Sequence, residues 1–253
     1  MNYPVSLQNK VVVIIGGSGG IGAATAGCFA AKGSQVVITH REGREKSEAA
    51  LQFLQTLEGT GHSAYAADVA DTSTLLKLRD AVAAKYGRAD VLVNAAGFTK
   101  PVPHADLDAL DDALIDRMFA VNWRGQFAAI RTFTPMLKAS GNGLIVSVSS
   151  IAGTTGAGSS IAYCATKAGI DVMTKSLGRA LAPEIRVLGV SPGVVDTGFV
   201  PGRDADFNAK TSATTPLKRV ADPEDVANAI LACATHLGFS TGTNIVVDGG
   251  RML

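Results

Sequence analysis

The sequence has little of what marks disulfide scaffolds, metal sites and membrane spans. Its 253 residues include only 3 cysteines and 4 histidines. Cys28, Cys164 and Cys233 lie far apart, which fits a reducing compartment better than a disulfide scaffold, and no Cys or His cluster has metal-ligand spacing. The N-terminal stretch has no apolar signal region, and the early apolar run Val11–Ile15 is far shorter than the roughly 20 residues that span a bilayer. We therefore expect a soluble, cytoplasmic protein with no metal and no membrane partner.

An excess of charge of one sign is also missing. Lys and Arg number 23 against 22 Asp and Glu, a formal net charge of +1, which argues against a nucleic-acid or anionic-membrane partner. Hydrophobic residues make up 47% and charged residues 18%, so a sizeable core is expected and disorder is excluded. The 28 glycines follow no three-residue period and come with only 9 prolines, which excludes collagen-like and low-complexity chains.

Short β-branched runs alternate with alanine-rich segments of helical spacing along the whole chain. The expected strands lie near Val11–Ile15, Gln35–Thr39, Ser63–Ala66, Val91–Val93, Leu144–Ser147, Ile185–Val190 and Asn244–Val247. The expected helices are Ile21–Ala31, Arg44–Leu57, Thr72–Tyr86, Asp111–Lys138, Ala162–Leu181 and Pro223–His236. This alternation predicts the α/β class: a single domain over residues 1–253, Rossmann-type and doubly wound, with a mostly parallel seven-stranded sheet and helices on both faces. One irregular polar stretch, Thr197–Thr215, is typical of a binding loop, with a plain surface loop as the alternative.

A glycine-rich turn follows the first expected strand. Residues 16–22 read GGSGGIG, and an apolar helical pattern at Ile21, Ala24 and Phe29 begins at once. Residues without a Cβ let the backbone approach a pyrophosphate, and the N-terminus of the following helix presents unpaired N–H groups and a partial positive charge to it. The turn predicts a dinucleotide site, with a tight packing turn as the alternative.

The end of the second expected strand bears on which nicotinamide cofactor binds. An NAD enzyme generally places a carboxylate here to accept hydrogen bonds from the adenosine ribose. The sequence instead has His40 followed by Arg41, whose planar fork of donors suits a 2′-phosphate that a carboxylate would repel. We therefore favour NADP(H) over NAD(H), although Glu42 and Glu45 leave open that this segment is only the charged start of a helix.

Tyr163 and Lys167 stand four residues apart in a segment of helical spacing, which places the phenol and the ammonium on one helix face. A carbonyl that accepts a hydride becomes an alkoxide and must be protonated, and the pKa of a free tyrosine, about 10, is high for that task. The positive charge of Lys167 would stabilise the phenolate. Tyr163 is thus predicted to donate the proton in reduction and accept it in oxidation, while Ser150 hydrogen-bonds the substrate oxygen.

Together these motifs resemble the classical short-chain dehydrogenase/reductase family. Gly16, Gly20 and Gly22 match its T-G-x-x-x-G-x-G turn, except that Ile15 stands where the family usually has a Thr whose hydroxyl ties the first strand to the fourth. Asn122, Ser150, Tyr163 and Lys167 match its Asn-Ser-Tyr-Lys tetrad and are the expected catalytic residues. The match covers essentially the whole chain, through Pro192–Thr197 and Thr241–Gly250.

The resemblance implies further roles. Asp68 would contact the adenine, the Asn94–Gly97 turn would contact the adenosine ribose, Lys167 would hold the nicotinamide ribose, and Asn122 would anchor a water that relays protons. The expected cofactor-binding residues are Gly16, Ser18, Gly19, Gly20, Ile21, Gly22, His40, Arg41, Asp68, Val69, Asn94, Ala95, Gly97, Tyr163, Lys167, Pro192, Gly193, Val195 and Thr197. A homo-oligomer, tetramer or dimer, is also implied, with contacts through Asp111–Lys138 and Ala162–Leu181.

Substrate choice is expected to reside in three segments beyond the sheet edge: Phe98–Asp106, Ile151–Ala162 and Thr197–Thr215. They contain few charges near the expected reaction centre, which favours an apolar or acyl substrate over a phosphorylated one. The pattern resembles the 3-oxoacyl carrier-protein reductases. However, the turns at Ala139–Gly143 and Ala182–Glu184 lack the basic residues with which that subfamily docks its acidic carrier.

The main hypothesis is therefore an NADP(H)-dependent oxidoreductase that interconverts a ketone and a secondary alcohol, with 3-oxoacyl reduction as one candidate. A same-fold alternative is an NAD(H)-dependent sugar, polyol or secondary-alcohol dehydrogenase, which differs mainly at Arg41. An alternative of another class is a non-enzymatic nucleotide-binding redox sensor, which we would expect to lack Tyr163 and Lys167.

Overall fold

The computed structural model describes residues 4–203 and 205–253, and they form an α/β structure around one seven-stranded sheet. The strands are β1 (Val11–Ile15), β2 (Gln35–His40), β3 (Ser63–Ala66), β4 (Val91–Asn94), β5 (Gly143–Val148), β6 (Ile185–Pro192) and β7 (Thr243–Val247). They lie in the order β3-β2-β1-β4-β5-β6-β7, and every neighbouring pair is parallel. The predicted Rossmann-type sheet is confirmed.

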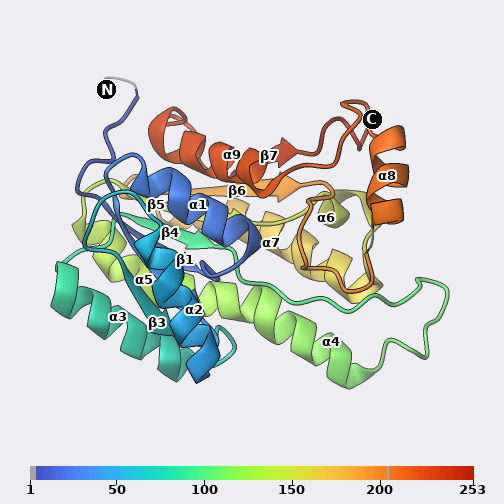
Figure 1. Ribbon diagram of the computed structural model, residues 1–253, viewed down its shortest axis with the longest axis horizontal. Helices are drawn as coiled ribbons and strands as arrows, with labels where there is room; N and C mark the ends of the chain where they lie inside the picture. Colours follow the sequence, from blue (N-terminus) through green and yellow to red (C-terminus); the bar gives the residue numbers. More distant parts are fainter. Residues whose placement is uncertain (1–3, 204) are drawn as a thin grey trace.

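Helices cover both faces of this sheet (Figure 1). They are α1 (Gly20–Ala30), α2 (Arg44–Gln55), α3 (Thr72–Tyr86), α4 (Asp112–Phe119), the π-helical turn η1 (Ala120–Arg124), α5 (Gly125–Ala139), α6 (Ala152–Thr155), α7 (Ile161–Ala180), α8 (Ala205–Thr214) and α9 (Pro223–Thr235). Core residues of α1, α2 and α9 pack on one face, and those of α3, α5 and α7 pack on the other.

The apolar runs form strands because both sheet faces are covered. Every residue of β1, β4 and β5 is buried, which is why these strands show continuous hydrophobicity rather than alternation. In the register, Ile14 of β1 lies between Ile38 of β2 and Val93 of β4. Burying side chains of this size stabilises the fold by roughly 1.5–3 kcal/mol each relative to exposure.

The strand order reverses direction at β1. The chain proceeds from β1 to β2 and β3 on one side, then crosses back to β4 on the other side of β1. Loops leaving the carboxyl ends of β1 and β4 therefore diverge, and ligands of open parallel sheets bind in the crevice between them. The glycine turn after β1 and the Asn94–Gly97 turn after β4 meet at this edge.

Two sequence-based expectations need refinement. The expected helix Asp111–Lys138 is present as the contiguous segments α4, η1 and α5, and the backbone hydrogen bonds over Ala120–Arg124 follow the wider π pattern. The stretch Thr197–Thr215 is not irregular throughout, since it contains the helix α8. Its mixed polar sequence gives α8 almost no amphipathic pattern, so periodicity could not reveal it.

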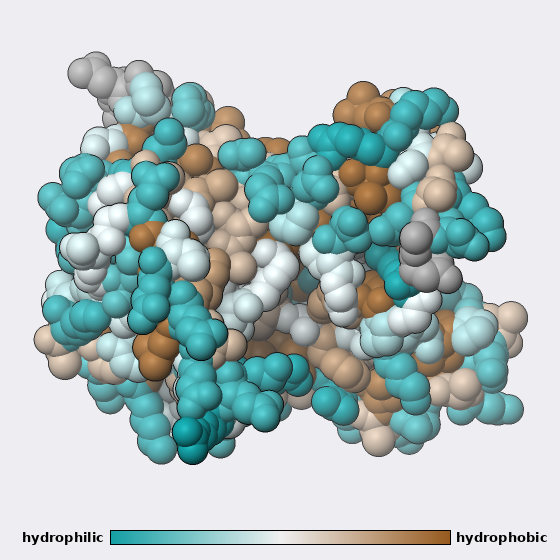
Figure 2. Space-filling view, in the orientation of Figure 1, coloured by the Kyte–Doolittle hydropathy of each residue, from teal (hydrophilic) through white to brown (hydrophobic). Residues whose placement is uncertain are grey.

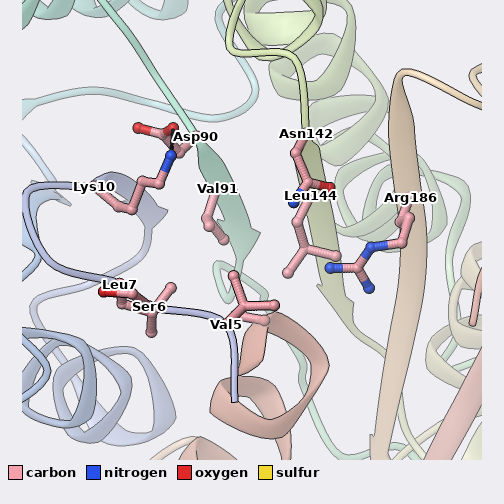
Figure 3. A pocket seen from close by; sticks show the side chains of 10 residues that line it. Val5, Ser6, Leu7, Lys10, Asp90, Val91, Asn142, Leu144 and Arg186 are labelled. Atoms are coloured by element: carbon pink, nitrogen blue, oxygen red, sulfur yellow. Dashed lines mark hydrogen bonds and ion pairs between the residues drawn. The ribbon is translucent and has the colours of Figure 1, made fainter. Parts of the chain in front are cut away.

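A cavity of about 30 Å³ lies at the opposite, amino edge of the sheet, between Lys10, Asp90 and Arg186 (Figure 3). Lys10 donates to Asp90 across 3.1 Å beside it. This volume holds a water molecule or two rather than an organic ligand. Among the residues with assigned structure, no helix is long and apolar enough to cross a membrane, and no three or more His, Cys, Asp or Glu side chains gather as a metal site.

Candidate active site

The glycine turn is shaped by close backbone approaches. Gly16 has φ +83°, and a Cβ on it would lie 2.7 Å from the backbone nitrogen of Ala96 after β4. A Cβ on Gly22 would collide with the carbonyl oxygen of Gly16. Thr39, near the end of β2, fixes the turn because its Oγ1 accepts a hydrogen bond of 2.8 Å from the Gly16 N–H. Glycine is thus required where the turn folds back over the sheet edge.

The N-terminus of α1 presents an open cradle. Gly19 is its N-cap, no side chain caps the helix, and a Cβ on Gly19 would meet no atom within 4 Å. The leading N–H groups and the positive end of the helix dipole therefore face an exposed surface at Ser18, Gly19 and Gly20. A dinucleotide pyrophosphate fits this cradle, since it needs N–H donors and room for its oxygens.

The end of β2 carries one inaccessible and one accessible residue. His40 is buried, and its Nδ1 lies 2.9 Å from the Arg41 carbonyl oxygen, so its side chain faces the protein interior. Arg41 is exposed, and no ion pair holds its guanidinium anywhere in the described chain. Arg44, three residues on, instead pairs with Glu48 at 2.7 Å. Of these cations, Arg41 is the one free to meet a phosphate.

The third and fourth strands end in residues that shape the same edge. Asp68 is exposed, and its Oδ1 accepts from the Ala70 N–H at 2.8 Å, while Val69 beside it is buried. Asn94 is fully buried; its Nδ2 donates to Ser147 Oγ at 3.4 Å, but its Oδ1 has no partner. Asn94 pairs in register with Ile15, so the orphaned oxygen lies beside the position where the family resemblance expects a Thr hydroxyl.

Ser150, Tyr163 and Lys167 come together beyond the carboxyl end of β5. Tyr163 and Lys167 lie one turn apart on α7, and the Lys167 Nζ is 5.6 Å from the Tyr163 ring centroid. Lys167 is buried and donates from Nζ to the Val148 carbonyl oxygen at 2.7 Å. Ser150, two residues past β5, is also buried, and its side chain lies close enough to the Tyr163 phenol to lower the pKa of that phenol.

Burial raises the pKa of Tyr163 to about 12, although the hydrogen bond with Ser150 and the positive charge of Arg203 each lower it. The predicted stabilisation of the phenolate by Lys167 stays a prediction, since Lys167 is not among the charges that shift this pKa in the structure. The Lys167 ammonium is turned toward the Val148 carbonyl, and the cost of a buried phenolate outweighs the nearby favourable groups. Tyr163 therefore keeps its proton at neutral pH.

Lys167 has a carboxylate neighbour one turn further along α7. Burial lowers the pKa of Lys167 to about 8, and the negative charge of Asp171 opposes that shift. Asp171 is itself held by Ser149, which donates at 2.5 Å, and by the Asn244 side chain on β7. Residues from β5, α7 and β7 thus set the charge of Lys167. The sequence did not predict Asp171 or Asn244 as site residues, because a single polar residue in an apolar segment forms no recognisable motif.

Asn122 lies in the π-helical turn η1 and is fully buried. Its Oδ1 accepts from the Phe98 N–H at 2.7 Å, and its Nδ2 donates to the Phe98 carbonyl at 2.9 Å and to Thr166 Oγ1 at 3.2 Å. The side chain therefore braces the turn after β4 against α7. Its Oδ1 keeps a second lone pair, so the water that the family resemblance implies at Asn122 stays a prediction.

Residues 192–197, at the end of β6 and after it, lie over the carboxyl edge of the sheet next to the glycine turn. Gly193 donates to the Val247 carbonyl at 3.0 Å, and Val195 forms a bridge with Ala221. The Thr197 side chain lies against Gly20, since a Cβ there would be 3.2 Å from Thr197 Cγ2. Pro192, the last residue of β6, accepts from the Ile151 N–H at 3.0 Å. Residues 192–197, which were expected to bind the cofactor, therefore lie beside the glycine turn.

Phe199 and Arg203 lie in the expected substrate segment Thr197–Thr215, and the sequence did not single out Arg203. The Phe199 and Tyr163 rings are 6.1 Å apart between centroids, and the charge of Arg203 acts on the Tyr163 phenol. Spacing alone could not show where these side chains lie. In Figure 2 the surface is hollowed between the side that carries α1 and α2 and the side that carries α8, and this hollow runs along the same edge.

Comparison with known proteins agrees with this geometry. A family model described as enoyl-(acyl carrier protein) reductase matches residues 16–251. The chain belongs to the short-chain dehydrogenase/reductase family. It is 37% identical to the granaticin polyketide synthase ketoacyl reductase 2 of Streptomyces violaceoruber, over 97% of each chain. It is 38% identical to the cis-4-hydroxycyclohexanecarboxylate dehydrogenase of Sinomonas cyclohexanicum, again over 97% of each.

Solved structures of this short-chain family superpose closely. A short-chain dehydrogenase/reductase from Burkholderia xenovorans gives a TM-score of 0.88 at 34% identity, covering 96% of this chain and 98% of that one. The aldohexose dehydrogenase of Thermoplasma acidophilum gives 0.85 at 25% identity, covering 99% and 96%. The chain is thus an oxidoreductase of the short-chain family that acts on CH–OH or C=O groups with a nicotinamide cofactor, NAD(P).

Proposed function

We propose that this short-chain enzyme interconverts a ketone and a secondary alcohol with NADP(H), using Tyr163 to move the proton. The observation that carries the proposal is the placement of Ser150, Tyr163 and Lys167 at one sheet edge, beside an uncapped glycine turn. A non-enzymatic redox sensor would need only the turn. The buried Ser150 and Lys167 on either side of the half-buried Tyr163 favour catalysis instead.

The cofactor is assigned as NADP(H) because of Arg41. It stands exposed at the carboxyl end of β2, where an adenosine ribose would lie, and it meets no carboxylate in the parts of the chain that are described. Bound there, NADPH would supply the hydride. The glycine turn, Asp68, Val69, the Asn94–Gly97 turn and residues 192–197 would hold it, together with Lys167.

The proton chemistry follows from the residues themselves. Tyr163 keeps its proton at neutral pH and so suits the donor role toward a forming alkoxide, which is far more basic than a phenolate. Ser150 would hydrogen-bond the same oxygen and stabilise the charge that develops there. Lys167, with a pKa of about 8, would favour the phenolate left behind. Asn122 would hold in position the Phe98 turn that lines the reaction centre.

Three segments that lie beyond the carboxyl edge of the sheet are proposed to bind the substrate. They are Phe98–Asp106, Ile151–Ala162 and Thr197–Thr215, which belong with the sheet in one domain spanning the chain. The relatives' names specify a ketoacyl reductase, a hydroxycyclohexanecarboxylate dehydrogenase and a D-threitol dehydrogenase. Reduction of a 3-oxoacyl substrate and NAD(H)-dependent oxidation of a polyol are therefore the two alternative reactions. The description of the matching family model adds enoyl reduction as a reaction to test.

A panel assay tests the proposal. The purified protein would be given simple cyclic ketones, 3-oxoacyl and enoyl thioesters, polyols and secondary alcohols, each with NADPH or NADH, or with the oxidised forms. We expect ketone reduction that is faster with NADPH than with NADH. Turnover of no ketone or alcohol with either cofactor would overturn the proposal, and reduction of the enoyl thioester alone would replace it.

A further inference from the structure

The segment after β6 brings a guanidinium to the proposed reaction centre. Arg203 is half-buried, and its Cζ lies 4.7 Å from the centroid of the Phe207 ring on α8. Four residues earlier, Phe199 contacts Tyr163 and also lies 3.4 Å from the position of a Cβ on Gly97. The chain that carries Arg203 is therefore held by aromatic contacts on both sides, one of them with the proposed proton donor.

Charge on Arg203 reaches the reaction centre. Burial lowers the pKa of the Arg203 guanidinium, and its interaction with the Tyr163 phenol opposes that shift. A second cation, Arg251, is close enough to disfavour the charge further. The Nη1 of Arg251 donates to Thr214 Oγ1 at 3.2 Å and to Thr215 Oγ1 at 3.4 Å, at the end of α8. Arg203 thus lies within electrostatic reach of Tyr163, and Arg251 lies within reach of Arg203.

No carboxylate pairs with Arg203 in residues 4–203 and 205–253. Holding a guanidinium half-buried beside another cation costs free energy unless an anion compensates. The planar fork of an arginine matches a carboxylate through two parallel hydrogen bonds. Phe199, Phe207 and Tyr163 make the surroundings apolar, and a monoanion loses less hydration there than the dianion of a phosphate ester.

We propose that Arg203, supported by Arg251, binds a carboxylate of the substrate, so that the preferred substrates are oxo acids and hydroxy acids. This inference rests on the proposed function, because it places the carboxylate relative to Tyr163. It also revises the expectation, drawn from the sequence, that few charges lie near the reaction centre. The reacting carbonyl would lie at Tyr163 and Ser150, and the carboxylate toward α8.

The test compares matched substrates. 4-Oxocyclohexanecarboxylate and its neutral primary amide have nearly the same shape and differ in charge. We expect the wild-type protein to reduce the carboxylate with a kcat/KM about tenfold or more above that of the amide, as for a hydrogen-bonded charge pair. Arg203→Gln should abolish this preference by lowering kcat/KM much further for the carboxylate than for the amide, with the NADPH Kd nearly unchanged. Arg203→Lys, which keeps the charge and loses the fork, should fall between.

A control variant separates local from general effects of charge. Arg79→Gln removes a half-buried arginine of α3 that pairs only with its neighbour Asp80 in the described structure, and it should leave the preference intact. Equal rates for the two substrates in the wild type, or an equal loss for both in Arg203→Gln, would overturn the carboxylate site. Weaker NADPH binding in Arg203→Gln with the preference retained would overturn it as well.

A binding arm distinguishes failure of this inference from failure of the proposed function. Cyclohexanecarboxylate cannot be reduced, and we expect it to raise the melting temperature of the wild-type protein more than cyclohexanecarboxamide does, with the difference lost in Arg203→Gln. If no ketone or alcohol is turned over, the proposed function fails, and this arm alone decides the anion site. Turnover of neutral ketones only, with no stabilisation by the acid, overturns the inference and leaves the function standing.

Discussion

At the scale of single residues, the site depends on how burial and neighbouring charges set the protonation states of a few side chains. Tyr163 is kept protonated by burial, and Lys167 has its pKa lowered to about 8 by the same effect. The two pKa values shift in opposite directions, but both shifts favour the neutral group, since burial disfavours the charged form of each. The sequence predicted that the pair would share a helix face, but the balance between burial and charge required coordinates.

The cofactor preference is expected to follow Arg41. In Arg41→Ala, NADPH should bind about tenfold to a hundredfold more weakly, because hydrogen bonds to a charged phosphate are worth about 1.5–3 kcal/mol, while NADH should be nearly unaffected. Fluorescence titration of both cofactors measures this. Arg44→Ala is the matched control, since Arg44 is held by Glu48. Equal weakening of NADPH and NADH would remove the assigned role.

The pH dependence of ketone reduction is expected to report Lys167. Its ammonium is charged below its pKa of about 8, so kcat/KM should fall as the pH rises through that value. Because the charge of Asp171 raises the pKa of Lys167, Asp171→Asn should move this falling limb to lower pH. Ser149→Ala removes a hydrogen bond to Asp171 but keeps its charge, and should move the limb less. A limb that stays in place in Asp171→Asn would contradict the coupling.

At the scale of elements, the strand ends and the turns that follow them build the site. The glycine turn and α1 were predictable from the sequence because a strand, a glycine run and an apolar helical pattern follow one another directly. The π turn η1 within Asp111–Lys138 and the helix α8 were not predictable. A π turn leaves the apolar periodicity almost unchanged, and α8 has no apolar face from which a helix could be predicted.

Two glycines of α1 should respond oppositely to alanine. Gly22→Ala forces a methyl group into the Gly16 carbonyl oxygen and should lower the free energy of unfolding by about 1–3 kcal/mol, with weaker cofactor binding. Gly27→Ala, on the same helix with open space around it, should raise stability by roughly 0.5–1 kcal/mol. Chemical denaturation of both variants measures these changes. Equal stability of the two would contradict the close packing of the turn.

At the scale of the whole molecule, the seven-stranded parallel sheet, its two helical faces and the edge where ligands bind were all predictable from the alternation of strands and helices. What the sequence could not show is which side chains the long connection after β6 delivers to that edge. Arg203 acts on Tyr163 from a connection that continues into α8, whose end receives a hydrogen bond from Arg251, and such long-range placement leaves no local pattern.

Association of copies is expected through the helices on one face. Phe119, Phe127 and Val172 of α4, α5 and α7 are exposed apolar side chains, and Phe127 stacks on Trp123 with centroids 6.0 Å apart. We expect light scattering to show a tetramer or dimer, and Phe127→Glu to lower the mass by burying a charge at the contact. The solvent-facing variant Arg79→Gln should not change the mass. A wild-type protein that is only monomeric would contradict this expectation.

The central claim is that Tyr163 transfers the proton as the ketone is reduced, and one measurement tests it most directly. Tyr163→Phe removes the hydroxyl and keeps the ring that contacts Phe199. Reduction of a ketone under saturating NADPH should then be slower by roughly 10²–10⁴-fold, while the melting temperature and the NADPH Kd stay near those of the wild type. Ketone reduction by Tyr163→Phe at a rate close to that of the wild type would contradict the account.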